Sequence, residues 1–166
     1  MTAYHEAGHA LAAWILPHAD RVHKISIVSR GNMGGHTSLL PEEDRYLWTK
    51  NQFLDMMVVT MGGRVAEQLI FDEVTTGASN DIERATKTAL SMIKQYGMSE
   101  GLGPRTFGKR EEMIFLGREI SEQRDYGDRV AEEIDEEVKE LVNMSYRRAE
   151  EILVTHKPKL VRLAEF

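Results

Sequence analysis

The sequence predicts a mainly helical domain with a small β-hairpin or sheet beside its N-terminal helix. Most apolar residues recur at helical spacing, in long segments that together cover most of the chain. Two short segments, residues 24–29 and 36–40, have a strand pattern instead, and a glycine-rich stretch separates them. The length of 166 residues suits a single domain with a core of its own.

The first predicted elements are a helix and a hairpin. The helix covers residues 3–16 and ends before Pro17, which cannot continue a helix. Apolar residues alternate along the strand at residues 24–29. A turn at residues 31–35 leads into a second strand at residues 36–40, which ends before Pro41.

Further helices follow. Residues 42–44 are acidic and suit a solvated helix start, and residues 46–61 have an apolar helical face. Gly62 and Gly63 are expected to interrupt that helix, with a short helix at residues 64–71 after them. Residues 80–96 form the clearest amphipathic helix. For it we predict an Asn80–Glu83 capping box at the start and Gly97 beyond the end.

The C-terminal third combines an irregular segment with helices. Residues 98–124 are glycine-rich and predicted to be irregular, residues 125–156 form a long charged helix, and a last helix begins at Lys159. Residues 103–109 come close to a phosphate-binding G-x-x-x-x-G-K loop. Because Arg110 replaces the Ser or Thr that binds magnesium, a phosphate site is not expected there.

Composition excludes several classes of protein. The net charge is −6 and no basic stripe with interleaved aromatic residues occurs, so nucleic acid is not an expected partner. There are no cysteines, which rules out disulfides and thiolate ligands and leaves His, Asp and Glu to bind any metal. No apolar run approaches the ~20 residues of a membrane span.

The most informative motif is H-E-x-x-H at residues 5–9. On a helix each residue advances by about 100°, so His5 and His9 lie one turn apart on the same face and can aim both imidazoles at one ion. Glu6 is the next residue along the same helix, about 100° further round its axis, and its side chain can reach a water beside that ion. This is the position of the general base in a zinc peptidase. Because His5 lies in a first turn that would fray, we expect the natural chain to continue upstream of Met1.

A catalytic zinc usually takes three protein ligands, and the third is less evident. The metzincin extension is excluded, because Ala12 and Ile15 occupy the places of its glycine and histidine. Asp81 would lie in the first turn of a helix, where the macrodipole favours a carboxylate. Glu67 is the other acidic candidate, and the residues alone do not decide between Asp81, Glu67 and the rest.

Four segments, in this order, resemble the peptidase domain of the FtsH family of membrane-bound AAA+ metalloproteases. They are His5-Glu6-Ala7-Gly8-His9, Gly62-Gly63-Arg64-Val65-Ala66-Glu67, Thr75-Thr76-Gly77-Ala78-Ser79-Asn80-Asp81 and Tyr96-Gly97-Met98-Ser99-Glu100. The resemblance covers nearly the whole chain. It implies that residues 1–166 are one zinc metallopeptidase domain of a longer chain, whose ATPase and transmembrane parts lie outside this sequence.

The resemblance also implies roles for individual residues. His5, His9 and Asp81 would bind zinc, Glu6 would be catalytic, and Glu67 would lie close to the site and orient a ligand imidazole through its other ring nitrogen. The implied activity is cleavage of unfolded or translocated protein substrates by a homohexamer coupled to an ATPase ring. The implied location is the cytoplasmic face of the bacterial inner membrane, or its organellar equivalent.

Substrate could be held through its backbone by pairing with a strand edge. The predicted edge comprises Gly34, Gly35, His36, Thr37 and Ser38, although an ordinary hairpin strand explains the same pattern equally well. Two other readings of the chain remain. One is a non-catalytic, zinc-stabilised oligomerisation scaffold, and the other is a helical interaction module with a fortuitous motif.

Overall fold

The computed structural model describes residues 1–28, 35–40, 46–108 and 125–166. Within these ranges the chain forms five α-helices, one short 3₁₀-helix and one two-stranded antiparallel sheet, so the predicted mainly α fold is confirmed. The predicted helix start at residues 42–44 and the segment 109–124 lie outside the described ranges. None of the described helices has the length and hydropathy needed to cross a membrane.

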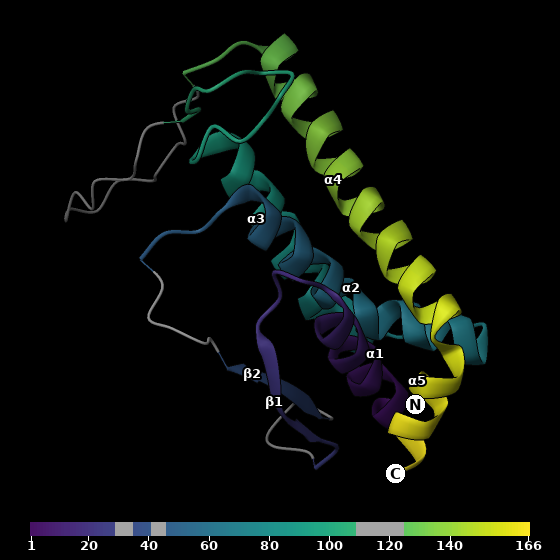
Figure 1. Ribbon diagram of the computed structural model, residues 1–166. Helices are drawn as coiled ribbons and strands as arrows, with labels where there is room; N and C mark the ends of the chain where they lie inside the picture. Colours follow the sequence, from purple (N-terminus) through teal and green to yellow (C-terminus); the bar gives the residue numbers. More distant parts are fainter. Residues whose placement is uncertain (29–34, 41–45, 109–124) are drawn as a thin grey trace, which may run out of the picture.

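Two helices, α1 and α2, form the centre of the fold. Helix α1 (Thr2–Ile15) packs along α2 (Lys50–Phe71), and α4 (Asp128–Thr155) covers α2 from another side (Figure 1). Helix α5 (Lys157–Glu165) turns back onto α1, where Tyr4 Oη donates to Glu165 Oε1 at 3.0 Å. The main hydrophobic core lies between these four helices.

Helix α3 (Ser79–Lys94) contacts both α2 and α4 (Figure 1). It follows a 3₁₀ turn, Thr76–Ala78, which connects it to the end of α2. Two smaller apolar clusters join α3 to its neighbours, one around Met57 and Met92 and one around Ile93 and Phe107. The start of α3 lies close to the N-terminal half of α1, because Asp81 Oδ2 is 3.1 Å from His5 Nε2.

The hairpin packs on the other side of α1. Strand β1 (Arg21–Ser26) pairs with β2 (His36–Leu40), and the register pairs Ile25 with Thr37. The predicted bounds of β2 are confirmed. Strand β1 begins three residues earlier than predicted and ends at Ser26, because pairing with β2 sets its bounds rather than the alternation of apolar residues.

The predicted break at Gly62 and Gly63 is wrong, because α2 continues through both glycines to Phe71. Glycine lowers helix propensity, but here the absence of a side chain lets α1 approach α2 closely, and this packing outweighs propensity. Helix α2 begins at Lys50 rather than at residue 46. Its capping box is made by Thr49 and Gln52.

The predicted capping box at Asn80 and Glu83 is also wrong. The N-cap of α3 is Ala78, with no side-chain cap, because the preceding 3₁₀ turn leads directly into the helix. Helix α3 ends at Lys94, before the predicted residue 96, and Gly97 has a φ of 60°. Residues 97–108 contain neither helix nor strand, which agrees with the prediction for this segment.

Candidate metal centre

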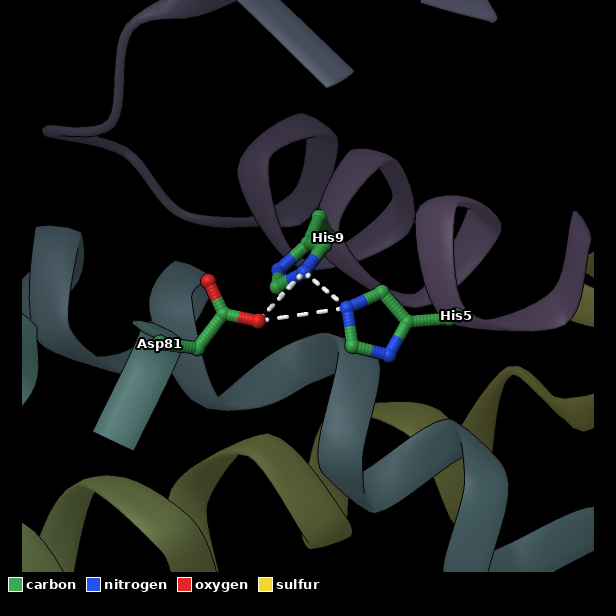
Figure 2. Close-up of side chains that lie close together, drawn as sticks. All are labelled: His5, His9 and Asp81. Carbon is green, nitrogen blue, oxygen red and sulfur yellow. Dashed lines mark hydrogen bonds and ion pairs between the residues drawn. The ribbon is translucent and has the colours of Figure 1, made fainter. Parts of the chain in front are cut away.

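The candidate metal centre combines residues of two helices, α1 and the first turn of α3. His5 and His9 lie one turn apart on α1, both 9% exposed, and Asp81 reaches them from the first turn of α3 (Figure 2). One ligand atom from each residue lies within 4.8 Å of the other two. The structure thus brings together the three residues predicted to bind zinc.

The three facing atoms form a nearly equilateral triangle. His5 Nε2 and His9 Nε2 are 3.0 Å apart, and Asp81 Oδ2 lies 3.1 Å from the former and 3.3 Å from the latter (Figure 2). A tetrahedral zinc ion with bonds of ~2.0–2.1 Å spaces its ligand atoms about 3.3 Å apart. Two imidazoles and one carboxylate at this spacing fit a zinc ion that keeps a fourth position open.

The other nitrogen of each imidazole is anchored within the fold. His5 Nδ1 lies 2.9 Å from Glu67 Oε1, and His9 Nδ1 lies 2.8 Å from the main-chain oxygen of Val59. Since both partners can only accept, each Nδ1 carries the proton and donates it. Each Nε2 is then left with a lone pair for a metal.

Glu67 is itself held in place. It is 2% exposed, and its Oε2 accepts from the backbone N–H of Thr75 at 2.9 Å. The hydroxyl of Thr75 lies 3.1 Å from the same oxygen. The loop before α3 therefore fixes the carboxylate that orients His5. The contact agrees with the expected position of Glu67 beside the site, while its effect on metal binding stays a prediction.

Charge and burial shift two of the ionisable groups. Burial alone would lower the pKa of His5, but hydrogen bonds with the Asp81 and Glu67 carboxylates outweigh it and raise that pKa above its ordinary value. Burial alone would raise the pKa of Asp81, yet its contacts with His5 and His9 lower it well below its usual range. An ionised Asp81 facing two imidazole nitrogens is suited to bind a cation.

Glu6, the predicted general base, lines the same cleft as the three facing atoms. It is 5% exposed and lines an open cleft of about 810 Å³ together with His5, His9 and Asp81. Its Oε2 accepts a hydrogen bond from Thr37 Oγ1 at 2.7 Å. A carboxylate is therefore present within the cleft that the three facing atoms line.

The predicted substrate strand borders the same cleft. Gly35, His36 and Thr37 line it, whereas Ser38 does not, and Gly34 lies outside the described residues. In the described part of the chain β2 pairs with β1 alone. Its position is compatible with a bound peptide, and the binding role stays a prediction.

Some contributors to the site were not found from the sequence. The main-chain oxygen of Val59 could not be identified from the sequence, since every residue has a main-chain oxygen whatever its side chain. Gly63 lies against both imidazoles, where a Cβ atom would be 2.5 Å from the Nε2 atom of each. The pair Gly62-Gly63 is visible in the sequence, but we interpreted it as a helix break and not as a close contact with another helix.

The fold and the site define a class of protein: a helical domain in which the two histidines of an H-E-x-x-H motif and an aspartate from a second helix form a group that could hold one metal ion. Comparison with known families identifies the family within this class. The model of Peptidase family M41 matches residues 1–166, and the chain belongs to that family.

Individual relatives agree with this assignment. The chain is 62% identical over 164 residues to "ATP-dependent zinc metalloprotease FtsH 1" of Sphaerobacter thermophilus and 61% identical over 164 residues to the protein of that name from Thermomicrobium roseum. It is 54% identical over 166 residues to "ATP-dependent zinc metalloprotease FtsH" of Pseudothermotoga lettingae. These matches cover 99% of this chain but only 25%, 25% and 26% of the relatives, so the chain spans about a quarter of their length.

Proposed function

We propose that residues 1–166 are a zinc-dependent endopeptidase domain that hydrolyses peptide bonds of unfolded protein substrates. The observation that carries the proposal is the triangle of His5 Nε2, His9 Nε2 and Asp81 Oδ2 beside the Glu6 carboxylate in one open cleft. The family assignment and the names of the relatives support the same chemistry.

His5, His9 and Asp81 would hold the ion, and Glu6 would transfer the proton. A bound zinc ion supplies Lewis acidity, which polarises a peptide carbonyl and makes a nearby water more acidic. Glu6 accepts a proton from the water that attacks the carbonyl carbon, and then delivers it to the leaving amine nitrogen as the C–N bond breaks. One water is consumed, and the products are a carboxylic acid and an amine.

The decisive experiment compares wild type with Glu6→Gln. Glutamine keeps the shape of Glu6 but cannot accept the proton, so zinc content should be unchanged while cleavage of casein falls by at least about a hundredfold. Zinc content is measured by metal analysis, and a chelator should abolish wild-type cleavage. A zinc-loaded wild type without cleavage would favour the non-catalytic scaffold. Purified protein without metal would favour the interaction module.

The longer relatives motivate a second part of the proposal. Because their printed names include "ATP-dependent", we propose that this domain works in a longer chain, coupled to an ATPase. Following the resemblance, we also propose a homohexamer located at the cytoplasmic face of a bacterial inner membrane or its organellar equivalent. Native mass spectrometry of the full-length protein tests the assembly, since a monomer at working concentration would contradict it.

A further inference from the structure

The carboxylate of Glu6 is held by the hairpin. Thr37 Oγ1, on β2, lies 2.7 Å from Glu6 Oε2 and 3.0 Å from the main-chain oxygen of Glu6. A hydroxyl has one proton, and the shorter contact, to the charged oxygen, is the stronger of the two hydrogen bonds it can make. The proton of the Thr37 hydroxyl is thus donated to Glu6 and is not available for donation to a peptide in the cleft.

The second oxygen of the carboxylate is approached closely by the same segment. A Cβ atom added at Gly35 would lie 3.0 Å from Glu6 Oε1 and 2.9 Å from both Ser26 O and Thr2 Cγ2. The absence of a side chain at Gly35 therefore lets the backbone before β2 approach the carboxylate. The hydrogen bond from Thr37 holds Oε2 of Glu6, and the backbone at Gly35 lies near the other oxygen.

Orientation matters for a residue with the role proposed for Glu6. A general base must have its accepting oxygen within about 2.6–3.2 Å of the proton it removes, and a misplacement of about 1 Å costs on the order of a hundredfold in rate. Burial does not ensure this by itself, because a glutamate side chain has several rotamers. The hydrogen bond from the Thr37 hydroxyl favours the rotamers of Glu6 that keep Oε2 at β2.

We propose that Thr37 is a positioning residue for Glu6: through its hydroxyl, β2 sets the direction of the general base. The proposal rests on the function proposed above and changes the role assigned to Thr37. The backbone of residues 35–37 can still pair with a peptide, whereas the side chain of Thr37 acts on the base.

The kinetic test compares Thr37→Val with Thr37→Ser. Valine keeps the shape and the β-branched side chain that suits a strand but lacks the hydroxyl, and serine keeps the hydroxyl. We expect Thr37→Val to lower kcat by about tenfold to about a hundredfold, with KM and zinc content unchanged. Thr37→Ser should keep most of the wild-type kcat. Thr86→Val is the matched control, because the Thr86 hydroxyl donates to a helix carbonyl of α3, at Ile82 O.

Three outcomes overturn the proposal: a kcat of Thr37→Val within twofold of wild type, a higher KM at constant kcat, which would indicate peptide binding, or loss of zinc. If Thr37→Val does not fold, Thr37→Ala takes its place with the same expectations. Because wild type and Glu6→Gln are assayed in parallel, failure of the proposed peptidase activity is recognised separately.

A structural test does not depend on activity. In crystal structures of the wild type and Thr37→Val, both loaded with zinc, the Glu6 side chain should leave its wild-type rotamer or become disordered in the variant only. An unchanged, well-ordered Glu6 carboxylate in Thr37→Val overturns the proposal even if the protein cleaves no substrate.

Discussion

Gly8 of α1 and Gly62 of α2 lie back to back where the two helices meet. A Cβ atom added at Gly8 would be 2.3 Å from Gly62 O, and one added at Gly62 would be 2.6 Å from Gly8 O. Both distances are far below van der Waals contact and the neighbouring atoms belong to the backbone. The helix that carries the imidazoles is therefore positioned by a contact that only two glycines permit.

Gly8→Ala should destabilise the fold. Overpacking costs about 1–3 kcal/mol, and here the colliding atom is a backbone oxygen that cannot rotate away, so the loss should exceed the gain of about 1 kcal/mol in helix propensity. Chemical denaturation of the metal-free protein measures the change in the free energy of unfolding. Gly127→Ala, at a glycine with no atom within 4 Å of an added Cβ, is the control and should cost less than about 1 kcal/mol. Equal losses at the two positions would contradict the packing argument.

Gly63→Ala should weaken zinc binding more than it weakens the fold. The added methyl would lie 2.5 Å from the Nε2 atoms of His5 and His9, the atoms predicted to bind the metal. The imidazoles must move to admit it, and we expect zinc affinity to fall by at least about tenfold. Competition with a chromophoric chelator measures the affinity, and circular dichroism verifies that the helices persist. Unchanged zinc affinity would contradict the prediction, because it would show that the added methyl group does not displace the imidazoles from their metal-binding positions.

These glycines also show how far the sequence could predict the fold and the site. The spacing of the motif at residues 5–9 predicts a helix with His5 and His9 on the same face. The structure places both residues as expected. The role of Gly62 and Gly63 could not be predicted, because both glycines contact a helix about fifty residues earlier in the chain. Local propensity contains no information about such contacts, so a helix break was the natural prediction.

The remaining parts of the site depended on the resemblance or were missed. Spacing left Asp81 and Glu67 as alternatives, the resemblance favoured Asp81 as the ligand, and the folded chain places Asp81 at the Nε2 atoms and Glu67 at Nδ1 of His5. The hydrogen bond between Thr37 and Glu6 joins residues that are 31 positions apart. No periodicity links a strand residue to one particular residue of a helix, so this contact required three-dimensional information.

Asp81→Ala should weaken zinc binding more than Glu67→Ala does. Asp81 contributes one of the three facing atoms, whereas Glu67 acts on His5 through a hydrogen bond of 2.9 Å. Loss of such an outer partner typically costs 10–100-fold in metal affinity, and loss of a ligand costs more. Zinc titration of both variants tests the order, with Asp72→Ala as a control at an exposed carboxylate. The reverse order would make Glu67 the better candidate for the third ligand.

The stabilisation by zinc should increase with pH. In the metal-free protein the pKa of His5 is raised above 6.5, so the stability contributed by protonated His5 is complete below that value and is lost as pH rises through the folded-state pKa. Asp81, whose pKa is lowered from 3.8, stays ionised throughout this range. Zinc needs the neutral imidazole and must displace the proton, so the rise in Tm caused by zinc should be larger at about pH 8 than at about pH 6. Glu67→Gln removes one carboxylate that raises the pKa of His5, so in this variant the pH dependence of the zinc-induced rise in Tm should shift to lower pH. Differential scanning calorimetry with and without zinc measures this rise in wild type and in Glu67→Gln. A zinc-induced rise in Tm that is independent of pH would show that zinc displaces no proton from His5.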